Sequence, residues 1–164
     1  MDESRASREL GERPVREWVG IALRLGGEAC LVARDDAREV LAFPPQLTRV
    51  PGAKPWIRGL GNVHGALLPV IDLRQYLGGG PTPQMRQTRI LVVNHRDIPA
   101  GFMVDEVMGF RRFVASEFGP APSPLPLPAS APWITGAYRR GGEQWPVLDL
   151  RQLIENPGFL DAAA

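Results

Sequence analysis

Apolar and polar residues alternate in short runs along most of this chain. Between Trp18 and Leu25 the large apolar residues occupy every second position, and this period of two predicts a half-buried strand. By the same criterion, and by short apolar runs bounded by Gly, Pro or polar turns, further strands are predicted at 29–33, 38–43, 57–63, 66–71, 90–94, 100–107, 134–138 and 144–148. Many short strands separated by turns are typical of an all-β fold built from barrels.

One stretch of the chain occurs twice. Residues 69–75 read PVIDLRQ and residues 146–152 read PVLDLRQ, and a Trp-Ile-x-Gly segment begins 13 positions before the Pro in both copies (56 to 69, 133 to 146). In each copy the Asp is followed three residues later by Gln, which is the arrangement of a capping box. A short helix is therefore predicted after each Asp, with its apolar residues covering one end of a barrel. Because Pro lacks an N–H donor, each Pro is expected at a sheet edge or a strand start.

Three segments fall outside this pattern. Residues 1–17 are polar and charged and are expected to form a flexible N-terminal arm. Residues 119–132 contain six Pro, which predicts a stiff, extended connector between the two halves. Residues 156–164 are expected to form a C-terminal tail, so that residues 18–155 make up one domain of two lobes.

The composition narrows the classes of function. The chain has 164 residues, with 19 basic and 18 acidic side chains, and the net charge of +1 gives no reason to expect broad attraction to nucleic acid or to anionic lipid. No apolar run approaches the roughly 20 residues of a membrane span, and the charged start lacks the apolar core of a signal peptide. A cytoplasmic protein is therefore predicted. The single cysteine cannot form an internal disulfide, which agrees with a reducing compartment.

The residues that could carry catalysis have simpler structural explanations. Neither His64 nor His95 lies in a metal-binding spacing, and no Ser lies in a nucleophile motif. Cys30 is better explained as a small buried residue of a strand than as a nucleophile. Asp72 and Asp149 share a helix-cap context that explains both without acid–base chemistry. The sequence thus predicts no enzyme, no cofactor and no metal site.

A second interpretation is a small barrel that binds single-stranded nucleic acid. Basic and aromatic residues are adjacent in FRRF at 110–113 and in YRR at 138–140, and stacking aromatics among cations suit single strands. Two such doublets in a nearly neutral chain are more often ordinary surface charges. This interpretation is therefore kept as the alternative.

Residues 56–78, WIRGLGNVHGALLPVIDLRQYLG, resemble the signature of the CheW-like adaptor proteins, [F/W]-I-x-G, N-x-R-G and P-V-[I/V]-D-L-R. VPG at 50–52 and GFMVDEV at 101–107 occupy the places of two further family motifs, L-P-G and G-x-x-V-D-x-V. The resemblance extends from about Trp18 to Ile154. It implies two SH3-like five-stranded β-barrel lobes that receive strands from each other, and a protein without activity of its own.

The resemblance also implies partners. CheW-like adaptors bind the regulatory domain of a CheA-type histidine kinase with one face, and the cytoplasmic tip of a chemoreceptor in the groove between the barrels. The polar arm, Trp56 and the ending GFLDAAA are most similar to the members that control type IV pilus twitching motility, whose kinase is ChpA and whose receptor is PilJ. A cytoplasmic protein recruited to membrane-associated receptor arrays or to the cell pole is expected, monomeric outside the array and bound to no nucleic acid.

Six residues are carried over from the family by motif position as partner contacts: Glu39, Val40, Arg58, His64, Val104 and Val107. The two valines Val104 and Val107 would line the apolar receptor groove, although alternating Val in a strand is as often core. Arg58 is equally well explained as a solvated edge charge. His64 stands where the family has Arg; because His cannot form a bidentate fork, either the partner differs to match, or the contact is weaker, or His64 is merely a hairpin-tip residue.

Overall fold

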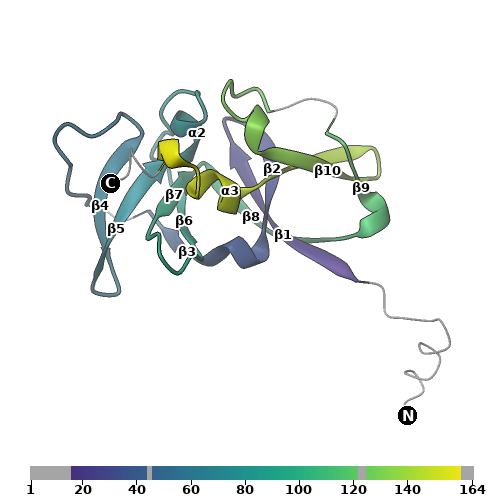
Figure 1. The fold of residues 1–164 in the computed structure, drawn as a ribbon, viewed down its shortest axis with the longest axis horizontal. Coiled ribbons are helices and arrows are strands. Elements are labelled where there is room, and N and C mark those ends of the chain that lie inside the picture. Colours follow the sequence, from purple (N-terminus) through teal and green to yellow (C-terminus); the bar gives the residue numbers. More distant parts are fainter. Residues whose placement is uncertain (1–15, 44–45, 122–124, 160–164) are drawn as a thin grey trace, which may run out of the picture.

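The strands of this chain form two sheets (Figure 1), in a computed structural model that describes residues 16–43, 46–121 and 125–159. The arm predicted for residues 1–17 lies almost entirely outside the described residues, as do residues 122–124 of the connector and residues 160–164 of the tail. The predicted boundaries of the domain, 18–155, remain a prediction.

The five-stranded sheet, which we call lobe 1, has the order β3-β6-β7-β5-β4. Its strands are β3 (Ala37–Ala42), β4 (Ile57–Val63), β5 (Ala66–Asp72), β6 (Arg89–Val93) and β7 (Gly101–Val104). The turn between β4 and β5 consists of His64 and Gly65, with φ of 51° and 83°. Positive φ at both positions is what a two-residue hairpin requires, and it confirms the predicted hairpin tip.

The six-stranded sheet, which we call lobe 2, has the order β8-β1-β2-β11-β10-β9. Its strands are β1 (Glu17–Leu25), β2 (Glu28–Ala33), β8 (Glu106–Val114), β9 (Phe118–Gly119), β10 (Ile134–Arg140) and β11 (Glu143–Leu148). The first two strands of the chain thus pair with its last four, so the halves exchange strands. Short 3-10 turns complete the order: η1 (Arg34–Asp36), η2 (Ala115–Glu117) and η3 (Ala131–Trp133).

The chain passes from lobe 1 to lobe 2 at Asp105. The sequence predicts one strand over 100–107, but β7 ends at Val104 and β8 begins at Glu106 in the other sheet. The backbone N–H of Asp105 donates to the carbonyl of Arg24 on β1, 3.1 Å away. The alternation of apolar residues continues through the crossover, and for this reason the pattern alone does not reveal it.

Successive residues of the central strands face different apolar clusters. On β1, Ala22 points into the core of lobe 2 and Leu23 points into a layer shared by both lobes. On β6, Ile90 points into the core of lobe 1 and Leu91 into the same shared layer. These strands are therefore buried on both faces, which explains their runs of apolar residues. The all-β, two-lobed fold predicted from the sequence is confirmed.

Two short helices, α2 (Leu73–Tyr76) and α3 (Leu150–Ile154), lie near the middle of the molecule in Figure 1. Leu73 and Leu150 are fully buried in the shared layer, so the end of each barrel that its helix covers is the one that faces the other lobe. Phe159 joins them there, with its ring centroid 5.5 Å from that of Tyr76 and 5.8 Å from that of Phe102. The helices thus hold the two lobes together.

The two copies of the repeat make the same backbone hydrogen bonds and the same helix caps. Asp72 donates its backbone N–H to the carbonyl of Trp56 at 2.7 Å, and Asp149 donates to that of Trp133 at 2.8 Å. In both copies the Asp side chain accepts the backbone N–H of the Gln three residues on, at 3.2 and 3.1 Å. The predicted N-caps are confirmed, while the second bond of the expected capping box is replaced by the bond to Trp.

The Gly of each Trp-Ile-x-Gly segment is required for a steric reason. The pairing register shifts between Ile57 and Gly59, and the neighbouring backbone approaches closely at that bulge. A Cβ on Gly59 would lie 2.6 Å from the carbonyl oxygen of Thr48, and one on Gly136 would lie 2.7 Å from that of Gly119. Only glycine fits at these two equivalent positions.

The prolines of the repeat lie inside β5 and β11 rather than at a strand start. Pro69 pairs with Leu60 on one side, and the parallel partner β7 pairs only from Val70 onward. Val147 likewise marks the only pairing of β11 with β2. At each Pro the strand has a neighbour on one side only, so its missing N–H donor costs no ladder bond, as expected for an edge position.

Candidate functional site

A groove of about 620 Å³ runs between the two lobes. It lies between β3 of lobe 1 and β1 and β8 of lobe 2, and we call it the inter-lobe groove. Its lining includes Ile21, Ala37, Glu39, Val40, Val107 and Phe110. Phe110 is 60% exposed and Val40 is 40% exposed, so apolar surface is open to solvent along the groove. The lining also includes the charged residues Arg34, Asp35 and Arg38, and exposed apolar side chains surrounded by polar ones are typical of a protein-binding site.

Three of the six residues expected to contact partners come together in this groove. Glu39 and Val40 enter it from β3, and Val107 enters from β8. His64 reaches the same place from the β4–β5 turn, with its Nε2 3.1 Å from Oε2 of Glu39. The pair joins the hairpin tip to the rim of the groove.

The groove continues beyond that pair into a second hollow of about 430 Å³. Glu39 lines both, and the second hollow adds His64 and Leu67, whose side chain is 65% exposed. Sequence reasoning missed Leu67 and assigned Phe110 to the nucleic-acid alternative. Leu67 and Phe110 are both large apolar side chains at strand positions that face outward. The period of two marks alternate positions of a strand, but it does not say which of its two faces points outward until the fold is known.

Val104 does not line the groove. Its side chain is fully buried in the shared layer, on the face of β7 opposite to the core of lobe 1. The partly buried Val107 packs against the same shared layer, and of the two valines Val107 alone lines the groove. The expectation that both valines line a receptor groove is corrected for Val104.

Arg58 is separate from the groove, because it occupies the bulge at the start of β4. Its Nη1 donates to Oδ2 of Asp72 at 3.1 Å, and Asp72 is fully buried. Thr82 adds its backbone N–H at 2.7 Å and its hydroxyl at 2.6 Å to the same carboxylate. The guanidinium therefore compensates a buried charge, and it is not the solvated edge charge considered from sequence.

The only cysteine lies in the shared layer as the sequence predicts. Cys30 is fully buried, and burial raises the pKa of its thiol to about 12. The thiol is therefore protonated and poorly nucleophilic at neutral pH. Across residues 16–43, 46–121 and 125–159, no group of three or more His, Cys, Asp or Glu side chains is placed to hold a metal ion. Within the same ranges no helix is long and apolar enough to span a membrane.

Several of the aromatic and basic residues on which the nucleic-acid interpretation depends contact other side chains of the protein. Phe113 and Tyr138 are buried and stacked on each other, with ring centroids 4.7 Å apart. Arg140 lies over the ring of Phe113, and its Nε is 2.9 Å from a carboxylate oxygen of Glu117. Only Phe110 of the three rings is open to solvent, and one exposed ring does not make the row of stacking surfaces that a single strand needs, so the structure does not favour the nucleic-acid interpretation.

Two strand-exchanging β lobes around a shared apolar layer, with an open groove between them, define a protein-binding fold. The chain belongs to the family described as "CheW-like domain", whose sequence model matches residues 20–157. It is thus a CheW-like scaffold protein of chemosensory systems.

Relatives support this assignment along nearly the whole chain. Protein PilI of Pseudomonas aeruginosa is 39% identical over 152 residues, which cover 93% of this chain and 84% of PilI. Protein FrzA of Myxococcus xanthus is 30% identical over 132 residues, covering 80% of this chain and 79% of FrzA. The crystal structure of the scaffolding protein TtCheW from Thermoanaerobacter tengcongensis superimposes with a TM-score of 0.73 at 23% identity, covering 87% of this chain and 96% of TtCheW.

Proposed function

We propose that this chain couples a chemoreceptor to a CheA-type histidine kinase in a pathway that controls type IV pilus twitching. The observation that carries the proposal is the inter-lobe groove, whose floor and rim expose Val40 and Phe110. The identity to PilI supports the choice of pathway, with a PilJ-like receptor and a ChpA-like kinase as the partners. The chain would be a cytoplasmic monomer that is recruited to receptor arrays or to the cell pole.

The groove suits the helical tip of a receptor. An amphipathic helix binds by laying its apolar face into an apolar groove, and Val40, Val107 and Phe110 supply such contacts from both lobes. The Glu39–His64 pair at the rim supplies polar contacts that would fix the position of the helix along the groove. Because both lobes line the groove, a movement of the bound receptor would change contacts with both of them. Such a change in contacts is the physical requirement for coupling.

The groove can be tested with a matched pair of substitutions. Phe110→Ser removes an exposed ring from the groove, whereas Phe118→Ser removes an exposed ring on β9 that does not line it. We expect Phe110→Ser to weaken binding of the receptor tip about tenfold, because an exposed aromatic side chain in the middle of an interface acts as an anchor, and a tenfold loss corresponds to about 1.4 kcal/mol. Phe118→Ser should leave the affinity within about twofold. Isothermal titration with the cytoplasmic tip of a chemoreceptor from the same organism measures both.

Two results would count against the groove as the receptor site. Equal affinities for the two variants would show that Phe110 makes no contact with the receptor. A larger loss for Phe118→Ser would place the receptor on the outer surface of lobe 2. A circular dichroism melt of each variant checks that the fold is retained.

A further inference from the structure

His95 lies where the two lobes meet, in the chain between β6 and β7 that we call the β6–β7 turn (residues 94–100). Its side chain is only 12% exposed, and its Nε2 lies 2.9 Å from Oε2 of Glu155, which follows α3. The β6–β7 turn, η1 and α3 together line a narrow gap, to which they contribute His95, Asp36 and Arg151. The bond between His95 and Glu155 therefore joins a turn of lobe 1 to the helix that follows β11 of lobe 2.

The hydrogen bonds of His95 define its protonation state in this structure. The backbone N–H of Asp97 donates to Nδ1 of the ring, 3.1 Å away, so Nδ1 has to carry a lone pair. The proton of the neutral ring then lies on Nε2, which donates to the carboxylate of Glu155. Both ring nitrogens have a partner only in this neutral tautomer.

A proton taken up from solvent would change the turn rather than the contact with Glu155. The proton would be added at Nδ1, where it would point at the N–H of Asp97. The charged ring would at the same time be held more strongly by Glu155, because a charge-assisted hydrogen bond is stronger than a neutral one. Since the ring is held, the backbone at Asp97 has to move away.

The β6–β7 turn belongs to the walls of both hollows of the candidate site. Asn94 lines the inter-lobe groove, while His95 and Arg96 line the second hollow. Asn94 also donates its backbone N–H to the carbonyl of Asp36 and its side-chain amide to that of Asp35, each at 2.9 Å. Asp35 is itself a lining residue of the groove. A movement of the turn would therefore change the wall of the groove, both directly and through the hydrogen bonds to η1.

Other charged and titratable groups surround His95 on every side. They come from α3 and its end, from η1, from the turn itself and, across the second hollow, from β3 and the β4–β5 turn: Arg151 and Glu155, Asp35 and Asp36, Arg96 and Asp97, and Arg38, Glu39 and His64. Burial, together with the neighbouring Asp149, raises the pKa of the Asp36 carboxyl. Asp36 is thus a second group that could take up a proton here, and a test has to separate it from His95.

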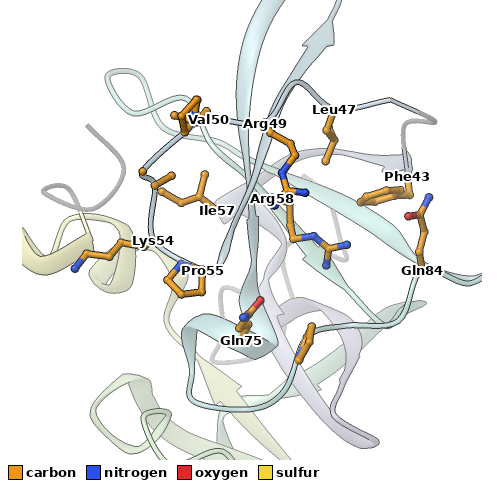
Figure 2. Close-up of a pocket in the computed structure, with 14 residues that line it drawn as sticks. Phe43, Leu47, Arg49, Val50, Lys54, Pro55, Ile57, Arg58, Gln75 and Gln84 are labelled. Carbon is orange, nitrogen blue, oxygen red and sulfur yellow. The ribbon is translucent and has the colours of Figure 1, made fainter.

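The hollow of about 830 Å³ on lobe 1 that Figure 2 shows has no such group. Arg49 and Arg58 lie near its middle and Lys54 lies at its edge, and its described lining contains no His, Asp or Glu. Arg and Lys side chains ordinarily stay charged throughout the pH range in which His titrates. An effect of pH near neutrality is therefore expected at the inter-lobe groove and not at this hollow, which shares no lining residue with it.

We propose that His95 is a proton switch, whose protonation rearranges the β6–β7 turn and weakens binding of the receptor tip in the inter-lobe groove. The effect on binding rests on the proposed function, whereas the tautomer of His95 and the movement of the turn do not. A receptor that fits the groove in this structure fits the neutral form of His95. Because coupling is reciprocal, the bound receptor would in turn hold His95 neutral.

Receptor binding at two pH values tests the switch. The chain has only two His, so single variants separate their contributions. We expect the unmodified protein to bind the cytoplasmic tip of a chemoreceptor from the same organism about fivefold more weakly at about pH 5.5 than at about pH 7.5. His95→Gln keeps an uncharged donor for Glu155, and its affinity should change less than about twofold between these conditions. His64→Gln should retain the fivefold change, whatever its own affinity. Titration of the receptor itself would appear equally in all three proteins.

Nuclear magnetic resonance of the unmodified protein without receptor tests the geometry alone. With ¹⁵N-labelled histidine, the ring of His95 should show the neutral tautomer with its proton on Nε2 at about pH 7.5. On acidification, the backbone amides of Asn94 and Asp97 should shift with the same midpoint as that ring. A ring of His95 that carries its proton on Nδ1 at about pH 7.5 would overturn the inference, irrespective of any binding result.

The outcomes separate this inference from the proposed function. If the receptor tip binds equally well at both pH values, or if His95→Gln retains the full pH dependence, the switch is wrong while the adaptor function stands. In the second case, retention by His64→Gln as well would assign the proton to a carboxyl such as Asp36. If the receptor tip does not bind at all, the proposed function fails and so does the effect on binding, and the magnetic resonance result alone decides whether the turn responds to protonation. Thermal unfolding checks that both variants keep the fold.

Discussion

Cys30 illustrates how burial decides the chemistry of a single residue. Its thiol lies in the shared layer, and its pKa of about 12 is above the ordinary value of about 8.5. Because the folded-state pKa is raised, the contribution of the thiol to stability is fully present below about pH 8.5 and is lost as the pH rises toward 12. At neutral pH the thiol is protonated in both the folded and the unfolded chain, so stability does not depend on pH through Cys30 there.

A thiol reagent at pH 8 should therefore react very slowly with the folded protein. The thiolate is the reactive form, and the raised pKa lowers its fraction at pH 8 by more than about a thousandfold, with burial slowing access further. Spectrophotometric titration with an aromatic disulfide reagent measures the rate, and the same protein in urea serves as the control and should react completely within minutes. Rapid reaction of the folded protein with one equivalent of reagent would contradict the buried position.

The resemblance to the family allowed part of the candidate site to be predicted. Motif position identified Glu39, Val40 and Val107, which the inter-lobe groove brings together. It failed for Val104, because the chain changes sheets at Asp105 and no local pattern marks that crossover. Local patterns also do not show which residues a side chain contacts across the fold. The ion pair between Arg58 and the buried Asp72 could therefore not be predicted from the sequence.

At the scale of elements, the two copies of the repeat have the same backbone hydrogen bonds, but their Asp side chains lie in different environments. Both Asp side chains cap a short helix, but Asp72 is fully buried and also accepts from Arg58 and Thr82. Asp149 is partly exposed, and Gln152 is its only donor among the described residues. The sequence predicts the caps in both copies, because capping depends on local spacing. The additional donors to Asp72 come from residues that are distant in the sequence, so they could not be predicted.

This difference predicts unequal costs for one substitution. Asp72→Asn leaves Arg58 without its counter-charge and places an amide against the donors of Thr82, so we expect a loss of about 2–4 kcal/mol in the free energy of unfolding. Asp149→Asn keeps an oxygen for the cap and should cost less than about 0.5 kcal/mol. Urea unfolding followed by tryptophan fluorescence measures both. Equal losses would show that the burial of Asp72 does not matter for stability.

At the scale of the whole molecule, the three apolar clusters explain how the strands are divided between the lobes. The period of two predicted the strands, and only the resemblance to a known family predicted that the halves exchange them. Strand exchange depends on contacts between residues far apart in the chain, such as the pairing of Val147 with Leu31 and of Val70 with Gly101. The inter-lobe groove depends on the same long-range arrangement.

The account as a whole requires that two partners bind one copy of this chain simultaneously. Sedimentation velocity of the purified chain mixed with the receptor tip and the kinase regulatory domain tests this requirement directly. We predict a species that contains all three components, because the inter-lobe groove occupies only part of the surface that the two lobes expose. A mixture in which each partner displaces the other from the chain would contradict the account.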